Sequence, residues 1–470
     1  MERAALPPRP DRPVRWDGVV GIGPASRKPA RPRGGCPQPI PSPTHPFRTS
    51  TTNPRERNTM TGPRTGGSAD VSQMYDVAAA RIARRIVKAA AKRVDVRFTF
   101  PDGGAWGPTA LGTPEFQLVA PREFYRRLGR DPKMAFGEAY VAGEWAAGGE
   151  TDLADLLTPF AATLETLIPA PLRKMRRVID RKLPHHTNNT RRGARSNIEA
   201  HYDMSNDLFR LFLDDTMTYS SAWFDDSDDF DDEPLESAQL RKLDGVLDYA
   251  DVSEGTRLLE IGTGWGSLAI RAAERGARVT TITLSQQQAE LATELVKDRG
   301  LDSLVDVRLL DYRDVEGEYD AIVSIEMIEA VGEEFWPSYF ATIDRHLAPG
   351  GRVAIQAILM GHDRMLETRN SYGWIQKYIF PGGLIPSMQA IEEVCAAHTT
   401  FRVTHRRELG VHYAETLRRW RATFNRRWDD IVPLGYDEAF RRTWEFYLAY
   451  CEAGFASRYL GVSQVRFARP

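Results

Sequence analysis

A glycine-rich turn is the strongest sign of chemistry in this sequence of 470 residues. Residues 257–261 predict an apolar strand that enters the turn, and one acid, Glu260, lies within that strand. Three glycines follow at alternate positions, Gly262, Gly264 and Gly266. Glycine lets a backbone approach a ligand closely, and ligands of open α/β sheets bind at the carboxyl ends of the strands. The turn therefore predicts a ligand site in which Glu260 orders the loop or meets the ligand, with a purely structural turn as the alternative.

Polar side chains follow the next two predicted strands. The strand at residues 278–284 ends in Thr283-Leu284-Ser285, and Gln288 comes shortly after. A nicotinamide enzyme usually carries an acid near this point for the ribose hydroxyls, whereas here hydroxyls and amides would serve the same ribose uncharged. Tyr312 follows the strand at 305–310 and is expected to offer its ring face to an adenine.

A further acid, Glu329, follows the predicted strand at residues 320–325. It is expected at the same edge of the sheet as the glycine turn, where ligands bind. A carboxylate in that position can accept a proton or orient a proton acceptor. We therefore interpret Glu329 as a catalytic acid–base group rather than as a surface acid.

Strand and helix patterns alternate from residue 196 to the end of the chain. Strands are predicted at 257–261, 278–284, 305–310, 320–325, 351–358, 401–409 and 463–468, and helices from Ser267, from Gln286 and around 336–347. This alternation predicts an α/β domain with a parallel sheet covered by helices on both faces.

The chain before residue 196 divides into three predicted parts. Residues 1–59 hold thirteen of the thirty prolines, which predicts disorder and suggests Met60 as the natural start. Residues 60–170 predict a small α+β domain: a helix at 71–91, a strand at 94–100 that pairs with 115–119, and helices over 121–147. Residues 171–195 form a basic linker, either a solvated helix or a patch held against anionic lipid headgroups.

Composition limits the partners and the compartment. The net charge of −2 gives no reason to expect nucleic acid, and the three cysteines have no metal-binding or disulfide spacing. No metal site is expected, and free thiols fit a reducing cytosol. No apolar run approaches the roughly 18–20 residues that span a bilayer, so a lipid would be reached from the membrane surface. The expected location is cytoplasmic and peripheral at the membrane.

Several ordered motifs over residues 75–468 resemble those of cyclopropane-fatty-acyl-phospholipid synthases and the related mycolic-acid and methyl-branching methyltransferases. Their E-x-G-x-G-x-G loop is the methyltransferase form rather than the phosphate-binding GxGxxG. The other matching segments are 137–145, 201–209, 217–224, 282–285 with Gln288, 326–332, 377–383, His412-Tyr413 and 446–455. The resemblance implies a Rossmann-like seven-stranded methyltransferase domain at residues 196–470, preceded by a lipid-docking domain.

The resemblance also implies the cofactor and the site residues. S-adenosylmethionine is expected to bind through Tyr219, Ser220, Gly262, Gly264, Thr283, Gln288 and Tyr312. A bicarbonate ion acts as the base in the family, and the positions that match its contacts are Glu329, Gln356, Ile358 and Tyr413. A cysteine often treated as catalytic falls at Cys451, although its aromatic helix favours an ordinary core residue.

This sequence departs from the best-known members of that family near the expected base. Ser221 replaces a cysteine, Ala330 replaces a histidine, and Gln356 replaces the histidine that contacts the ion. Glutamine can donate a hydrogen bond to an anion but does not titrate. The base is therefore expected to be held differently, with Glu329 either holding it or being it.

The implied reaction is methyl transfer to the double bond of an unsaturated acyl chain of a phospholipid. Methyl transfer leaves a carbocation in the acyl chain, and this cation must lose a proton in a site that excludes water. Loss from the added methyl gives a cyclopropane, whereas a prior hydride shift gives a methylene branch, or a methyl branch when a separate reductant supplies a hydride. The alternatives are a methyltransferase of a small soluble amine and a non-catalytic lipid-binding protein. Peripheral membrane contact is expected, and a homodimer is left open.

Overall fold

The computed structural model describes residues 68–167, 189–191, 193, 194, 197, 205–225, 230 and 232–470. The predicted N-terminal segment 1–59 and the basic linker up to residue 188 lie outside the described residues. The larger sheet has seven strands in the order β10-β11-β9-β8-β5-β6-β7. These are β5 (Arg257–Ile261), β6 (Arg278–Thr283), β7 (Val305–Leu309), β8 (Tyr319–Ile325), β9 (Leu347–Met360), β10 (Arg402–Glu408) and β11 (Leu460–Ala468).

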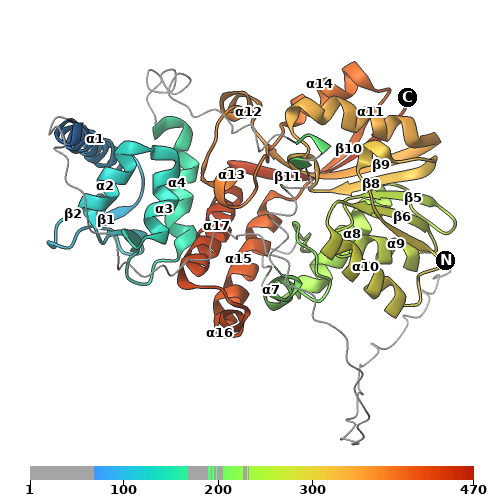
Figure 1. Cartoon of the computed structure of the whole chain (residues 1–470), viewed down its shortest axis with the longest axis horizontal. Helices are drawn as coiled ribbons and strands as arrows, with labels where there is room; N and C mark the ends of the chain where they lie inside the picture. Colours follow the sequence, from blue (N-terminus) through green and yellow to red (C-terminus); the bar gives the residue numbers. More distant parts are fainter. Residues whose placement is uncertain are drawn as a thin grey trace, which may run out of the picture. The chain divides into compact units, whose positions relative to one another are not determined.

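Five neighbouring strands of this sheet, from β7 to β9, run parallel, as the sequence predicted. The last two strands instead pair antiparallel, β11 with β9 and β10 with β11. Helices cover both faces, with α11 (Trp336–His346) and α14 (Met388–His398) on one face and α8 (Leu235–Tyr249), α9 (Ser267–Glu274) and α10 (Gln286–Asp298) on the other (Figure 1). Because both faces are covered, central strands such as β5 are almost continuously buried.

A smaller four-stranded sheet lies earlier in the chain, in the order β2-β1-β3-β4. The elements of this part are α1 (Ser68–Ala90), β1 (Arg97–Thr99), β2 (Ala105–Trp106), β3 (Glu115–Leu118), α2 (Pro121–Arg130), α3 (Pro132–Val141), β4 (Trp145–Ala147) and α4 (Leu153–Leu167). The predicted pairing of β1 with β3 is confirmed, and the pairing is parallel because the short strand β2 makes the hairpin with β1.

The prediction of helix up to residue 147 was wrong at its end. Residues 145–147 form β4, which pairs antiparallel with β3. Trp145 is fully buried on this strand, and its ring stacks 4.6 Å from that of Phe116 on β3. A large aromatic side chain gains more from this cross-strand packing than from a further turn of helix.

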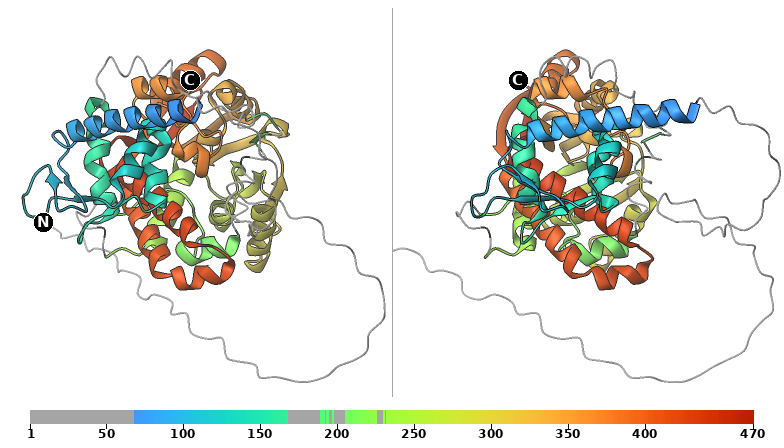
Figure 2. Two further views of the ribbon diagram at one scale, coloured as in Figure 1. Left: turned by 60° about the vertical axis from the view of Figure 1, so that its left-hand side comes forward. Right: turned by 90° about the vertical axis from the view of Figure 1, so that its left-hand side faces the viewer.

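Two long helices, α15 (Gly410–Arg426) and α17 (Glu438–Ala456), join the smaller sheet to the larger one through a shared hydrophobic core. Tyr140 on α3 packs 5.4 Å from Phe446 on α17, and its hydroxyl donates to Glu445 at 2.9 Å. Figure 2 shows α1, drawn in blue, running along the outside of this part of the molecule, where it packs against α2. The remaining helices are α7 (Asn206–Phe212), α12 (His362–Thr368), α13 (Trp374–Tyr378) and α16 (Trp428–Ile431), with short 3₁₀ turns η2 (Tyr312–Asp314), η3 (Ile328–Ala330), η4 (Glu333–Phe335) and η5 (Val432–Leu434).

Candidate functional site

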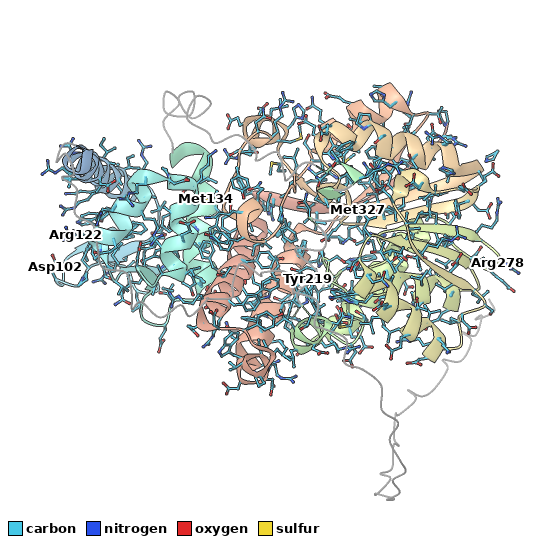
Figure 3. The ribbon with its side chains drawn as sticks, in the orientation of Figure 1. Asp102, Arg122, Met134, Tyr219, Arg278 and Met327 are labelled. Carbon is cyan, nitrogen blue, oxygen red and sulfur yellow. The ribbon has the colours of Figure 1, made fainter. Side chains whose placement is uncertain are left out.

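The carboxyl ends of β5, β6 and β8 meet at one edge of the parallel sheet, and α15 and α17 face that edge. Tyr219 and Met327 are both labelled in Figure 3, in the middle of the structure. Tyr219 contacts both long helices, with its ring 5.2 Å from Trp420 and its hydroxyl 2.7 Å from that of Tyr447. The site is therefore formed between the sheet edge and the two helices.

The glycine turn follows β5, and its three glycines all have positive φ: 101° at Gly262, 53° at Gly264 and 94° at Gly266. A Cβ at Gly264 would meet no atom within 4 Å, whereas one at Gly262 would lie 3.2 Å from Met327. Open space therefore lies beside Gly264, as a ligand site requires. Gly266 begins α9 and lies close to Ala292 of α10, which is a packing role.

Glu260 is buried beside this turn. Burial raises the pKa of its carboxyl to about 8, while Thr281 and Lys242 lower it. One of its oxygens, Oε2, has no hydrogen-bond partner among the described residues. An unpartnered buried polar atom costs roughly 1–3 kcal/mol, so a ligand that forms a hydrogen bond here would relieve that cost.

The polar residues after β6 form a hydrogen-bonded group at the carboxyl end of that strand. Thr283 Oγ1 lies 2.9 Å from Gln288 Oε1, and Ser285 caps α10 by accepting from the backbone N–H of Gln288 at 3.3 Å. Leu284 between them is half-buried. Tyr312 is buried in the neighbouring core with its ring 5.3 Å from Tyr339, so packing accounts for most of its surface.

Ser220 brings a buried lysine to the site. Lys242 on α8 is fully buried, and its Nζ donates to Ser220 Oγ at 2.6 Å. Burial lowers the pKa of Lys242 to about 8, while the carboxylates of Glu326, Asp214 and Glu260 raise it. At neutral pH the lysine therefore carries a positive charge among these acids.

Glu326 is the centre of the site's hydrogen bonds. Its carboxylate accepts from three donors, the Ser221 backbone N–H at 2.9 Å, Gln356 Nε2 at 2.8 Å and the Tyr413 hydroxyl at 2.7 Å. Burial raises the pKa of Glu326 above its usual range, while these donors and Lys242 lower it. Hydrogen bonds to a carboxylate favour its charged form. Glu326 is therefore a buried carboxylate held by donors from three segments.

The backbone at Glu326 is strained. Its φ is 49°, in the left-handed region where a side chain costs roughly 1–2 kcal/mol. Such strain persists where the surrounding structure holds it and is common at functional sites. A glycine would avoid the cost, so the carboxylate at this position indicates a function.

Glu329, the acid that the sequence singled out, lies in η3 beside Glu326. Its Oε1 accepts from the backbone N–H of Ile358, while Oε2 is buried with no hydrogen-bond partner among the described atoms. Burial, and next the negative charge of Glu326, raise the pKa of Glu329 to about 8. Two adjacent buried carboxyls rarely ionise together. At neutral pH we assign the charge to Glu326 and the proton to Glu329.

Burial raises the pKa of the Cys451 thiol to about 12. At neutral pH the thiol is therefore protonated and a poor nucleophile. This state agrees with the interpretation of Cys451 as an ordinary residue of its aromatic helix.

Comparisons with known proteins settle the family. Residues 189–465 match the family described as mycolic acid cyclopropane synthetase. The chain is 48% identical over 393 residues to the tuberculostearic acid methyltransferase UfaA1 of Mycobacterium tuberculosis, covering 82% of this chain and 91% of that protein. The chain belongs to the mycolic acid cyclopropane synthetase family.

Two further proteins extend this similarity. The cyclopropane-fatty-acyl-phospholipid synthase of Escherichia coli is 34% identical over 361 residues, covering 74% of this chain and 86% of that protein. The solved structure of the mycolic acid cyclopropane synthase CmaA1, complexed with SAH and CTAB, has a TM-score of 0.53 and 32% identity, and covers 61% of this chain and 98% of that chain. This synthetase-family chain is therefore an S-adenosylmethionine-dependent methyltransferase, and the family's reactions add a methyl or methylene group to lipid chains. The alternative of a non-catalytic lipid-binding protein was wrong.

The residues of the methyltransferase fit S-adenosylmethionine. The open space beside Gly264 and the unpartnered oxygen of Glu260 lie together after β5. The uncharged group of Thr283, Ser285 and Gln288 follows the neighbouring strand β6, where a ribose is expected. Among the residues that the structure describes, no cluster of three or more His, Cys, Asp or Glu side chains is arranged to hold a metal ion.

The expected bicarbonate set does not fit that ion. Gln356 and Tyr413, together with the backbone N–H of Ser221, already hold the carboxylate of Glu326, and the N–H of Ile358 holds Glu329. The second amide hydrogen of Gln356 goes to the Ser221 carbonyl at 3.3 Å. The donors that would bind a bicarbonate are therefore used by side chains of the protein itself.

Sequence reasoning missed Glu326 and Lys242 as site residues. Glu326 opens the segment 326–332 that supported the family resemblance, but attention went to Glu329 three positions later. The available signal was an acid directly after a predicted strand, at the sheet edge where ligands bind. Lys242 gave no such signal, because a lysine on an amphipathic helix normally faces solvent.

Gly264→Val should abolish binding of S-adenosylmethionine. A branched side chain would fill the open space beside Gly264, and its Cβ is strained at positive φ. Calorimetry should detect no binding while circular dichroism stays native. Gly300→Val, also at positive φ with open space but in the loop after α10, is the matched control and should bind normally. Normal affinity in a folded Gly264→Val protein would remove this turn from the cofactor site.

Proposed function

We propose that this methyltransferase acts on the double bond of an unsaturated acyl chain carried by a phospholipid, with Glu326 as the proton acceptor. The observation that carries the proposal is the buried carboxylate of Glu326, held by Ser221, Gln356 and Tyr413 at the sheet edge that also bears the glycine turn. S-adenosylmethionine supplies the methyl group, and the carbocation that this transfer forms in the acyl chain must then lose a proton.

The side chains of the site suit the removal of that proton. Three hydrogen-bond donors favour the ionised form of Glu326, and burial raises its pKa, which makes the carboxylate a stronger base than an exposed glutamate. Protonated Glu329 beside it adds no second negative charge. The positive charge of Lys242 interacts with Glu326 and partly balances its negative charge.

Aromatic rings next to Glu326 suit a cationic acyl chain. The ring of Tyr413 packs 4.5 Å from that of Phe455, and Tyr219 lies against Trp420 at 5.2 Å. Ring faces attract cations and exclude water, which otherwise captures a carbocation. An apolar, aromatic wall supports a lipid chain over a small soluble amine as the substrate.

We further propose a methylene-branched product rather than a ring, with a methyl branch formed only where a separate reductant supplies a hydride. The tuberculostearic acid methyltransferase is 48% identical to this chain, against 34% for the cyclopropane-fatty-acyl-phospholipid synthase. The test is mass spectrometry of lipids from a host that expresses this chain, followed by ozone treatment. Ozone cleaves a methylene-branched chain and leaves a cyclopropane intact. An ozone-resistant product that gained only CH₂ would indicate the ring, whereas an ozone-resistant product that gained CH₂ and two further hydrogens would be the reduced methyl branch. An unmodified phospholipid pool would contradict the substrate.

The surface of α1 supports docking on an anionic membrane. Ile82 and Ile86 lie one turn apart and are 58% and 53% exposed. Arg81 and Arg85, also exposed and one turn apart, lie beside them. Apolar side chains flanked by basic ones are typical of helices that lie in a membrane interface. No described helix is both long and apolar enough to cross a bilayer.

Replacing Ile82 and Ile86 together by serine should weaken binding to vesicles of phosphatidylglycerol, because the apolar contact is lost. Replacing Arg81 and Arg85 by glutamine should also weaken it, by about 1 kcal/mol for each residue, and should reduce its salt dependence. Vesicle co-sedimentation at two salt concentrations measures both effects. Val432→Ser, at an exposed apolar residue of η5, is the control and should bind as wild type. Equal binding of all variants would exclude α1 as the docking surface.

A further inference from the structure

A row of side chains crosses the sheet from the surface to Glu326. Arg407 on β10, Gln464 on β11 and Gln356 on β9 stand directly opposite one another in register, so they share one face of the sheet. Gln356 is in turn opposite Ile325, the residue before Glu326. Gln464 and Gln356 are both completely buried.

Hydrogen bonds connect this row without a gap. Arg407 donates to Gln464 Oε1 at 2.9 Å, Gln464 Nε2 donates to Gln356 Oε1 at 3.1 Å, and Gln356 Nε2 donates to Glu326. Gln464 Nε2 also donates to the backbone carbonyl of Lys242 at 2.9 Å. These four residues thus form one series of hydrogen bonds, each donating to the next, that ends on the carboxylate of Glu326.

Arg407 and Glu326, at the two ends of this series of hydrogen bonds, fix the orientation of the two glutamine amides between them. A guanidinium can only donate, so Gln464 must turn its oxygen toward Arg407 and its NH₂ toward Gln356. Gln356 must then accept with its oxygen and present its own NH₂ to Glu326. An amide turned the other way would place a carbonyl oxygen against the carboxylate.

The anchor of the row is itself held in place. The Arg407 guanidinium lies between two aromatic rings, 3.9 Å from Trp223 and 4.7 Å from Tyr249. Gly245 on α8 leaves room for it: a Cβ there would lie 2.7 Å from Arg407 Nη1 and 2.9 Å from Gln464 Oε1. Glycine is a poor helix residue, and this close approach explains its presence in the middle of α8.

We propose that Arg407 is a positioning residue that acts through Gln464 and Gln356 to hold Glu326 in its proton-accepting state. This inference rests on the proposed role of Glu326 as the base. Arg407 touches neither substrate nor cofactor. Its effect is to keep an N–H donor, rather than a carbonyl oxygen, against the carboxylate.

Gln464→Met tests this series of hydrogen bonds, because it keeps the charge of Arg407 and removes the amide that connects Arg407 to Gln356. Turnover should fall roughly 10- to 100-fold, the loss expected when a hydrogen bond to a charged group is disturbed. The acid limb of the kcat–pH profile should move to higher pH, because a carboxylate that loses a donor binds its proton more tightly. Affinity for S-adenosylmethionine should not change. The side chains of the other groups that face Glu326, namely Lys242, Glu329 and Tyr413, are unchanged in this variant, and only the backbone carbonyl of Lys242 loses the donor that Gln464 supplies.

Three more variants make the test specific. Gly245→Ala inserts a methyl between Arg407 and Gln464 while improving the helix, so it should shift the acid limb in a stable protein. Arg407→Lys keeps a side chain that can only donate, so its kcat–pH profile should stay close to that of the wild type. Arg407→Met removes the donor, so its acid limb should move to higher pH. Arg406→Met, the neighbour on β10 that donates to Ser463, should leave the profile unchanged.

An unshifted acid limb in both Gln464→Met and Gly245→Ala would overturn the inference. If the acid limb shifted only in Arg407→Met, Arg407 would act as a distant charge and not through Gln464 and Gln356. That result would also overturn the inference. Failure of the underlying proposal gives a different result, since Glu326→Gln would then turn over normally.

Discussion

Glu326→Gln should lower turnover by roughly 10²–10⁴-fold, the usual contribution of a positioned acid–base group. Glutamine keeps the size of the side chain, and its single oxygen can still accept from the Ser221 N–H and Gln356, which donate to the same oxygen of Glu326. It cannot take a proton from the carbocation in the acyl chain. Glu326 lies after β8, whereas the glycine turn lies after β5, so affinity for S-adenosylmethionine should be near normal. Single-turnover kinetics with vesicles of an unsaturated phospholipid, together with calorimetry of cofactor binding, measure the two effects separately.

Glu329→Gln is the matched control for that experiment. From the sequence alone, Glu329 was expected either to hold the base or to be it, and its replacement was expected to cause the large loss. Its pKa of about 8 means that it carries a proton at neutral pH, a state that glutamine imitates. We therefore expect Glu329→Gln to retain most of the activity at pH 7. If Glu329→Gln loses turnover while Glu326→Gln keeps it, the original assignment to Glu329 is correct and the proposed base is wrong.

The glycine turn and the parallel part of the sheet could be predicted from the sequence because local pattern determines both. Alternating strands and helices indicate a parallel sheet, and the carboxyl ends of its strands must share one edge. The residues after β6 were therefore placed correctly, since a short turn after a strand has little freedom. The position of β4 could not be predicted, because the burial of Trp145 against Phe116 depends on a strand some thirty positions away.

The identity of the base could not be predicted from the sequence for a similar reason. The three donors to Glu326 come from Ser221, Gln356 and Tyr413, which are far apart in the chain and meet only in the folded protein. The replacement of a histidine by Gln356 did indicate that the base is held differently, and Gln356 does donate to an anion. That anion is a side chain of the protein, which no spacing rule reveals.

Glu326→Gly should create an enzyme that depends on an added small carboxylate. Removing the side chain leaves a cavity lined by the Ser221 N–H, the Gln356 amide and the Tyr413 hydroxyl, all of which have lost their acceptor. The mutation also relieves the strain of a side chain at a φ of 49°, about 1 kcal/mol, which offsets part of the lost hydrogen bonding. Turnover without additive should fall as far as in Glu326→Gln.

Bicarbonate or formate at millimolar concentration should restore turnover of Glu326→Gly by about 10-fold or more, because an anion bound to those donors can accept the proton. The rescue should saturate with concentration, and chloride at equal ionic strength should give none. Glu326→Gln is the decisive comparison: its amide fills the cavity, so the same anions should not rescue it. Wild type should not respond either, since its own carboxylate already holds the donors. A folded Glu326→Gly protein that binds S-adenosylmethionine but gains nothing from any carboxylate would mean that Glu326 shapes the site without accepting the proton.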